Sequence, residues 1–236
     1  MDITWFGQSC FRLRFKAATI ITDPYNGDIG LKLPKQKADI VTVSHDHPDH
    51  SNLKAVSSDA LVLVDEAYFE FSRHTMRPHM TRYPNLVILR TFSKAFSMAG
   101  MRVGYLLGHE DVIRELKKVR QPYSVDAFSQ LVARITFRER VAFEQRISDI
   151  IAERERVYRA LASIDGVEAF PSEANFILFA VDGASRVFEG LRHRGILIKQ
   201  LHGSHPLLAQ CLRVTVGTPE ENSRFLDALK ETIRAL

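Results

Sequence analysis

A lysine flanked by hydroxyl residues, just after an apolar run, is the most chemically suggestive feature of this 236-residue sequence. Lys94 follows the apolar residues Leu86–Leu89, with Thr91 and Ser93 before it and Arg102 after it. An amine in such a setting suits a Schiff base to an aldehyde, while hydroxyl groups and an arginine suit a phosphate. The combination indicates pyridoxal phosphate (PLP), whose phosphate Thr91, Ser93 and Arg102 would hold.

Two further side chains follow the preceding apolar run. Asp65 ends the run Ala60–Val64, and Tyr68 comes shortly after it. Because ligands in open α/β sheets bind at the carboxyl ends of the strands, Asp65 and Lys94 are expected at one edge of a sheet. There the Asp65 carboxylate would keep the pyridine nitrogen protonated and Tyr68 would donate to the phenolic oxygen. Lys94 would also move a proton during the reaction.

Four segments in one order resemble fold-type I PLP-dependent aminotransferases, and most of all the histidinol-phosphate aminotransferase family. They are Asp65-Glu66-Ala67-Tyr68, Ser93-Lys94 with Arg102, Ala174-Asn175-Phe176, and Leu212-Arg213-Val214-Thr215-Val216-Gly217-Thr218. The resemblance covers about residues 57–236. The family's phosphate-binding loop at a helix N-terminus, its stacking aromatic residue and its cofactor-contacting asparagine have no recognisable counterpart before Asp65.

The resemblance implies a role for each matching residue. Lys94 would be the Schiff-base lysine, Asp65 the partner of the pyridine nitrogen and Tyr68 the partner of the cofactor oxygen. Arg213 would clamp the substrate carboxylate, with Asn175 lining the same pocket. The implied reaction is amino transfer between an amino acid or amino alcohol phosphate and a 2-oxo acid, as in histidine biosynthesis, with histidinol phosphate and 2-oxoglutarate as the suggested pair. The family also implies a homodimer.

A second cluster, His45, His47, Asp49 and His50, points to different chemistry. Imidazole and carboxylate ligands suit a divalent metal such as Zn²⁺, and such sites activate water for hydrolysis. Together with the rest of residues 1–56, the motif resembles the start of metallo-β-lactamase-fold hydrolases. Two alternatives therefore stay open beside the aminotransferase: a metal-dependent hydrolase, and a non-catalytic fusion that joins the head of one gene to the tail of another.

The predicted fold class is α/β in three segments. They are an N-terminal β-meander fragment of metallo-β-lactamase type at 1–56, a partial PLP-binding large-domain sheet at 57–120, and a C-terminal α+β small domain at 121–236. In the middle segment the runs Ala60–Val64, Leu86–Leu89 and Val103–Leu107 predict parallel strands buried on both faces. If the meander leaves this sheet uncovered, its apolar face would promote oligomerisation or aggregation.

The bulk composition excludes several other classes of protein. Hydrophobic residues make up 45% and charged residues 25% of the chain, and the net charge is +4. No basic stripe with interleaved aromatic residues is present, so no nucleic-acid partner is expected. No apolar run reaches the length of a membrane span and no secretory signal is recognisable, so a cytoplasmic protein is expected. Cys10 and Cys211 form no metal or redox motif.

Overall fold

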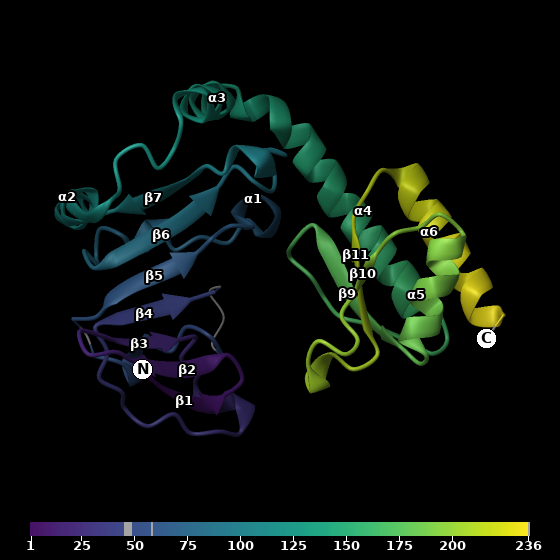
Figure 1. Cartoon of the computed structure of the whole chain (residues 1–236), viewed down its shortest axis with the longest axis horizontal. Coiled ribbons are helices and arrows are strands. Elements are labelled where there is room, and N and C mark those ends of the chain that lie inside the picture. Colours follow the sequence, from purple (N-terminus) through teal and green to yellow (C-terminus); the bar gives the residue numbers. More distant parts are fainter. Residues whose placement is uncertain (45–48, 58, 236) are drawn as a thin grey trace. The chain divides into compact units, whose positions relative to one another are not determined.

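The computed structural model describes residues 1–44, 49–57 and 59–235. The chain divides into two compact units, which are seen in Figure 1. The first unit comprises residues 1–69 and 73–138, and the second comprises residues 70–72 and 139–236. Each unit has its own sheet and its own hydrophobic core.

One seven-stranded sheet, in the order β1-β2-β3-β4-β5-β6-β7, forms the first unit. Its strands are β1 (Asp2–Gly7), β2 (Cys10–Arg14), β3 (Thr19–Thr22), β4 (Ile40–Val43), β5 (Leu61–Asp65), β6 (Leu86–Thr91) and β7 (Gly104–Gly108). Strands β1 to β3 form an antiparallel meander, and β3 to β6 are parallel. The predicted segments 1–56 and 57–120 therefore share one sheet, and the division between the units falls after Arg138 rather than near residue 120.

The prediction that Val103–Leu107 forms a parallel strand is wrong, because β7 runs antiparallel to β6. The connection between these strands holds only a short 3-10 turn, η4 (Ala99–Met101). A parallel return needs a longer crossover, usually with a helix, so the short connection produces a hairpin instead. Gly104 lets the two strands approach, since a Cβ atom there would lie 2.8 Å from the Arg90 carbonyl oxygen.

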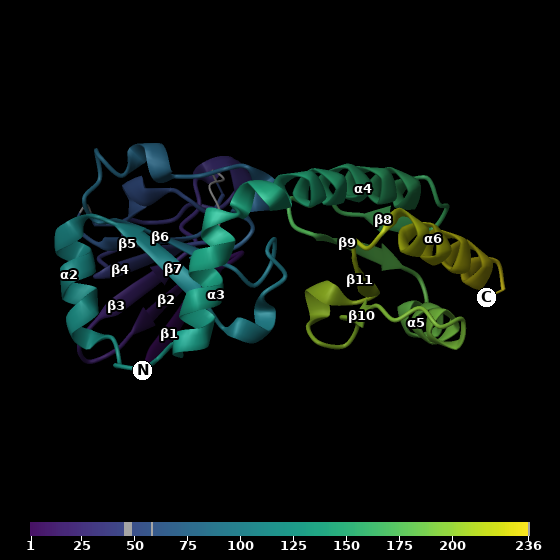
Figure 2. The same cartoon turned by 90° about the horizontal axis from the view of Figure 1, so that it is seen from above.

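The connections between the parallel strands all cover the same face of the sheet. Strands β3 to β6 are added in one spatial direction, and right-handed crossovers made in one direction fall on one side. Figure 2 shows these connecting loops gathered on one side of the strands. The resulting core contains Cys10, Ile21, Tyr25, Ala38, Val41, Val43, Val56, Ala60, Val62, Val64, Leu86 and Ile88.

The opposite face of this sheet is covered much less. Helix α2 (Glu110–Val119) lies over it at the β7 edge, where Ile113 and Val87 both approach Gly108. Further from that edge, Leu61 and Leu63 of β5 are only partly buried, while Val62 on the covered face is buried. The expected burial of β5 on both faces is therefore met on one face only.

The second unit is a four-stranded antiparallel sheet, in the order β10-β11-β9-β8, packed against three helices. Its strands are β8 (Val167–Ala169), β9 (Phe176–Val181), β10 (Lys199–Gln200) and β11 (Cys211–Thr215), and its helices are α4 (Glu144–Ala162), α5 (Ala184–His193) and α6 (Pro219–Arg234). Ile177 and Phe179 of β9, Leu212 of β11 and Leu229 of α6 are fully buried in its core. A sheet packed against helices is what the sequence predicts for the C-terminal α+β domain.

The remaining elements are short, apart from helix α3 (Ala127–Arg138). They are α1 (Phe69–Ser72), α3 (Ala127–Arg138), η1 (Gly27–Ile29), η2 (Leu53–Ala55), η3 (Arg77–His79), η5 (Arg140–Phe143) and η6 (Pro206–Leu208). In α3 the apolar positions Phe128, Leu131 and Ile135 are exposed, whereas Ser129 and Thr136 are buried. Among the helices of the described residues, none has the length and apolar character that crossing a bilayer requires.

Candidate active site

Asp65 and Tyr68 lie where β5 ends. Asp65 is the last residue of the strand and pairs with Leu89 of β6, and its side chain is exposed. One carboxylate oxygen, Oδ1, accepts the N–H of Ala67 at 2.9 Å, which fixes the turn that leads to Tyr68. The carboxylate is therefore held at the strand end and remains accessible to a ligand.

Lys94 lies in the loop that follows β6. The loop is anchored by its apolar side chains, because Phe92, Ala95 and Phe96 are buried while Lys94 is exposed. The Lys94 carbonyl accepts the N–H of Ser97 at 3.1 Å, which closes the turn around the lysine. The Lys94 Nζ atom lies 5.2 Å from the centroid of the Tyr68 ring. The structure thus brings together two predicted site residues from the ends of neighbouring strands.

The three residues predicted to hold a phosphate share this loop. The Thr91 hydroxyl lies 2.9 Å from the Ser93 hydroxyl and also accepts the Ser93 N–H at 3.0 Å. Arg102 has a left-handed backbone, with φ of 53°, and its guanidinium donates to the Ala99 carbonyl at 2.8 Å. The two hydroxyl groups are therefore hydrogen-bonded to each other, while the Arg102 guanidinium donates to a carbonyl of its own loop.

A buried ion pair behind these residues was not predicted from the sequence. Glu66 and Arg90 stand opposite each other at the ends of β5 and β6, and Arg90 donates to Glu66 Oε2 through Nε at 3.0 Å and Nη2 at 2.8 Å. Thr75 and the Met76 N–H also donate to the Glu66 carboxylate, and the Arg90 guanidinium stacks on Phe69 at 3.5 Å. This network joins the strand ends that carry Asp65 and the lysine loop. The sequence contains one sign of this ion pair, because Arg90 is a charged residue in the otherwise apolar segment that forms β6.

Arg213 and Asn175, the predicted substrate-binding residues, lie in the second unit. Arg213 stands in the middle of β11 with its guanidinium 4.7 Å from the centroid of the Phe176 ring. Its Nε atom is buried and has no hydrogen-bond partner among the described residues. The Asn175 carbonyl accepts the Val216 N–H at 2.9 Å, which places Asn175 at the end of the same strand pair. An anionic ligand could accept a hydrogen bond from this buried Nε–H group, which would otherwise stay without a partner.

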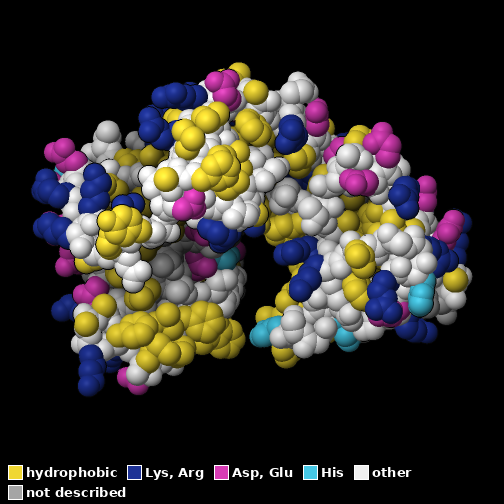
Figure 3. All heavy atoms as spheres, turned by 45° about the horizontal axis from the view of Figure 1, so that its top comes forward, with side chains coloured by type: hydrophobic (Ala, Val, Ile, Leu, Met, Phe, Trp, Pro, Cys, Tyr) yellow, Lys and Arg dark blue, Asp and Glu magenta, His cyan; other side chains and the backbone are white. Residues whose placement is uncertain are grey.

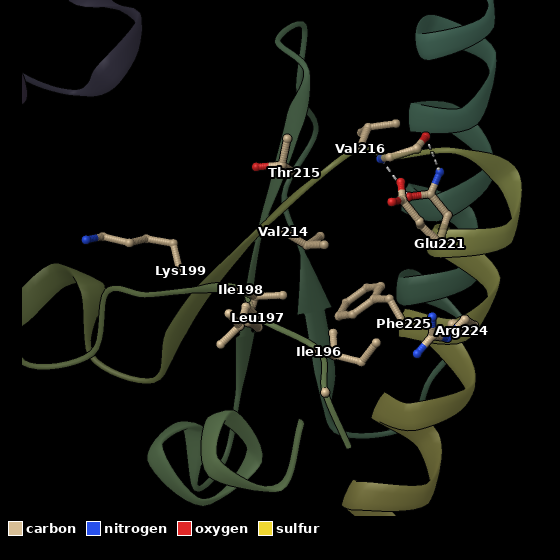
Figure 4. A pocket seen from close by; sticks show the side chains of 13 residues that line it. Ile196, Leu197, Ile198, Lys199, Val214, Thr215, Val216, Glu221, Arg224 and Phe225 are labelled. Carbon is tan, nitrogen blue, oxygen red and sulfur yellow. Dashed lines mark hydrogen bonds between the residues drawn. The ribbon is translucent and has the colours of Figure 1, made fainter. Parts of the chain in front are cut away.

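A cavity of about 520 Å³ lies between the end of β11 and α6. Figure 4 shows Ile196, Val214 and Phe225 along its wall, with Glu221 at one end and Lys199 directed away from it. Val214 and Thr215 of β11 line the cavity together with Val216 and Lys199, whereas Arg213 is not among its lining residues. The cavity therefore belongs to the packing between β11 and α6, and not to the predicted substrate site.

The histidine cluster is only partly covered by the structure. His45 and His47 lie outside the described residues, whereas Asp49 and His50 lie within them. His50 Nδ1 is 3.5 Å from a carboxylate oxygen of Asp23, and its Nε2 is 3.8 Å from one of Asp49. Within the described residues no group of three or more His, Cys, Asp or Glu side chains is arranged to hold a metal ion.

Comparison with known proteins links the chain to one family. The family model described as "Aminotransferase class I and II" matches residues 46–229, so the match begins inside the segment that resembled a metal hydrolase. A histidinol-phosphate aminotransferase of Polaromonas naphthalenivorans is 42% identical over 73% of this chain and 47% of its own length. One of Thermococcus kodakarensis is 38% identical over 96% of this chain and 67% of its own length. The chain spans about half the length of several curated relatives it matches.

Solved structures show the same fold. A histidinol-phosphate aminotransferase of Clostridium acetobutylicum superposes with a TM-score of 0.72 at 22% identity, over 84% of this chain and 65% of the other. One of Sinorhizobium meliloti, in complex with pyridoxal-5'-phosphate, gives 0.69 at 24% identity, over 84% and 58%. The fold, the order of the motifs and the extent of the family match agree. The chain therefore belongs to the class I and II aminotransferase family.

Proposed function

We propose that this chain is a PLP-dependent aminotransferase of the histidinol-phosphate type. The reaction would transfer an amino group between an amino acid or amino alcohol phosphate and a 2-oxo acid. The observation that carries the proposal is the approach of Lys94 to Tyr68 beside Asp65, at the ends of two neighbouring parallel strands. Similarity to histidinol-phosphate aminotransferases supports the type of substrate. The proposal includes a homodimer in the cytoplasm and a place in histidine biosynthesis.

The residues present fit the cofactor. When bound, PLP supplies an electron sink for the carbon that gives up its proton. Lys94 would bind the cofactor covalently and carry that proton on its amine. Asp65 would hold the pyridine nitrogen protonated through its accessible carboxylate, and Tyr68 would donate a hydrogen bond from its hydroxyl. The paired hydroxyl groups of Thr91 and Ser93 would bind the phosphate.

The substrate carboxylate would be bound by Arg213 with Asn175 beside it. A guanidinium matches a carboxylate with two parallel hydrogen bonds, and the unpartnered Nε of Arg213 is one of its donors. Stacking on Phe176 restricts the plane of the guanidinium, so less rotational freedom is lost when the carboxylate binds.

The cofactor is tested by a titration of the purified chain with PLP, followed by its visible absorption. We expect a saturable band that borohydride traps, with mass spectrometry locating the adduct on Lys94. The Lys94→Ala variant should lose both the band and the adduct, whereas Lys117→Ala, a change on the surface of α2, should keep them. A band that is equally strong in Lys94→Ala would contradict the proposal.

The substrate site is tested on the PLP-loaded protein by titrating an amino donor against the change in its spectrum. The Arg213→Gln variant should need about 10 to 100 times more donor, which is the usual effect of losing a charged hydrogen bond. Its PLP titration should match that of the unchanged protein. Arg224→Gln, on α6 at the separate cavity, serves as the matched control. An unchanged donor requirement in Arg213→Gln would remove Arg213 from the site.

A metal-dependent hydrolase from a fused metallo-β-lactamase-like segment at 1–56 is the second candidate. The sequence cluster His45, His47, Asp49 and His50 motivates it, and within the described residues His50 lies 3.8 Å from a carboxylate oxygen of Asp49. Zinc titration followed by metal analysis tests this candidate. A stoichiometric Zn²⁺ ion that His50→Ala abolishes would support it, and no retained metal would remove it.

A further inference from the structure

A second cavity, of about 440 Å³, lies on the covered face of the sheet in the first unit. Its floor is formed by buried side chains of β4, β5 and β6, namely Val41, Val62 and Leu86. Its walls come from the two connections that cross this face, one carrying η2 and the other η3. Such crossovers usually contain a long helix, but the described parts of these two contain none longer than the four residues of α1. They therefore cover the sheet incompletely and leave this space.

This cavity is distinct from the candidate active site. Val62 and Leu86 stand near the beginning of β5 and β6, whereas Asp65 and the loop of Lys94 lie at the ends of these strands. At about 3.3 Å per residue, the path along β5 from Val62 to Asp65 spans about 10 Å. A molecule in the cavity would therefore leave the position proposed for PLP free.

The lining combines an apolar interior with polar groups at the surface. Leu53 and Met76 are partly buried and extend the apolar floor, while Lys54, His79 and Tyr83 are exposed. Within the part of the chain that the structure describes, no hydrogen bond or ion pair engages the side-chain polar atoms of these three exposed residues. Small-molecule sites are typically cavities of about 300–1,000 Å³ with an apolar lining and a few polar groups. The cavity has the size and the composition of such a site.

Hydrogen bonds hold the walls in place without a ligand. The Met76 N–H donates to the buried Glu66 carboxylate at 2.7 Å, which fixes the wall that follows α1. The Asn85 side-chain amide donates to the Ala60 carbonyl at 2.6 Å, which ties the start of β6 to the start of β5. A site that is already formed loses less conformational freedom when a ligand binds.

The charge of the lining indicates the kind of ligand. Lys54 carries a positive charge, and none of the described residues that line the cavity is an aspartate or a glutamate. The Lys54 ammonium and the Tyr83 hydroxyl are donors for a carboxylate at the surface, and an apolar body would fill the interior. We propose that this cavity binds a small carboxylate with an apolar body, of the kind that a medium-chain fatty acid provides. The proposal goes beyond the aminotransferase function and holds whether or not PLP is bound.

Octanoate and octan-1-ol test the proposal, because they share an apolar chain and differ in charge. Equilibrium dialysis of the full chain against each radiolabelled compound gives the two dissociation constants. We expect one saturable octanoate site, with octan-1-ol bound about 10-fold more weakly because it lacks the charged contact. Lys54→Gln should weaken octanoate by about the same factor and leave octan-1-ol unchanged. Lys117→Gln, at an exposed position of α2, is the matched control and should change neither.

A second variant tests the apolar interior. Leu53 lies on η2 and lines the cavity, so Leu53→Phe fills part of the space and should weaken both compounds by about 10-fold or more. Circular dichroism shows whether this variant is folded. Lys54→Gln changes only an exposed side chain, so it carries the test if Leu53→Phe does not fold.

The exposed hydrophobic side chains over β1 and β2, at the lower left of Figure 3, are the competing surface for octanoate. Trp5, the sole tryptophan of the chain, is 64% exposed on β1, so its fluorescence reports binding there. Octanoate that shifts the Trp5 emission and binds equally well to Lys54→Gln would overturn the proposal. The absence of saturable binding, or equal affinities for octanoate and octan-1-ol, would overturn it as well.

Discussion

The two units each bury one face of a sheet, and they differ in what the other face carries. In the second unit the face away from α4, α5 and α6 bears Lys199, Arg213 and Thr215, which water or an anionic ligand can solvate. In the first unit the corresponding face over β1 to β5 is mostly aliphatic, with Ile3, Leu13, Ile20, Ile40 and Leu61 in one row, and its charged residue Asp65 stands at the end of β5. The difference teaches that a two-layer unit is complete when its outer face is polar, and needs a further layer when that face is apolar.

The same comparison applies to one arginine in each unit. Arg90 of the first unit is held by Glu66, Thr75 and the ring of Phe69. Arg213 of the second unit stacks on a ring but keeps a buried Nε atom without a partner in the part of the chain that the structure describes. The satisfied arginine stabilises its unit, whereas the unsatisfied one is available to a ligand.

The largest effect is expected from removing a phenylalanine in the closed core. Phe179→Ala in the second unit should lower the free energy of unfolding by about 3–5 kcal/mol, because it leaves a cavity against Phe225. Phe15→Ala, at an exposed position of the first unit, should change it by no more than about 0.5 kcal/mol in dilute solution. Urea unfolding followed by far-UV circular dichroism measures both. Equal losses would contradict the contrast between the closed core and the exposed surface.

The two arginines compared above, Arg90 and Arg213, give the next test. Arg90→Met should lower the free energy of unfolding by about 3 kcal/mol, since the Glu66 carboxylate would remain buried without its partner. Arg213→Met should leave it unchanged or raise it, because an unsatisfied buried donor is removed. Trp5 fluorescence follows unfolding of the first unit, and far-UV circular dichroism reports the helix-rich second unit. A large loss in Arg213→Met would mean that this arginine is structural.

Each unit also holds one buried cysteine with a raised thiol pKa, and Cys10 allows a test by pH. Burial, with a smaller contribution from the Asp23 charge, raises the pKa of Cys10 to about 11. The folded state therefore keeps a proton that the unfolded state releases near its ordinary pKa of 9.0. Stability from this difference is complete below pH 9 and falls as the pH rises through 11, by about 3 kcal/mol in total. The Cys10→Ala variant should lack this slope when Trp5 fluorescence is followed. An identical slope in the variant would assign it to other groups.

The smallest effect is expected at the link between α4 and α6. The Arg156 guanidinium donates to Glu153 at 2.8 Å and lowers the pKa of that carboxyl, and Asn222 donates to it as well. Glu153→Gln should lower the free energy of unfolding by about 1 kcal/mol at neutral pH. A lowered pKa means that the stabilisation is present above the ordinary pKa of 4.5 and disappears as the pH falls through the folded value. The difference between the two proteins should therefore close in acid. A difference that persists there would point to packing instead.

Local patterns predicted much of this molecule. The β-meander predicted within residues 1–56 is present as the antiparallel strands β1 to β3. The ordered motifs around Asp65, Lys94 and Arg213 identified the aminotransferase family, which the family match confirms. Residue types in a fixed order retain this information because each motif is local in the chain. The roles of the individual site residues stay predictions.

Features that depend on distant contacts were not predicted. On α3 the hydroxyls of Ser129 and Thr136 donate to the sulfur atoms of Met101 and Met98, which lie 28 and 38 residues away in the sequence. The Glu66–Arg90 pair needs the register of two strands that are separated in sequence. Each of these features depends on contacts between residues that are far apart in the sequence, so a local pattern cannot predict it.

The single direction in which β3 to β6 are added has a consequence for the lifetime of a bound cofactor. Doubly wound sheets reverse direction once, and the diverging connections at that reversal form a crevice that encloses the ligand. Strands β3 to β7 contain no reversal. A cofactor at Lys94 would therefore rest on strand ends rather than in a crevice, and its residence time would depend on its bond to that amine and on its contacts with Asp65, Tyr68 and the hydroxyl groups of Thr91 and Ser93. Exchange with free PLP should then be fast, with occupancy following the concentration of PLP in the surrounding solution.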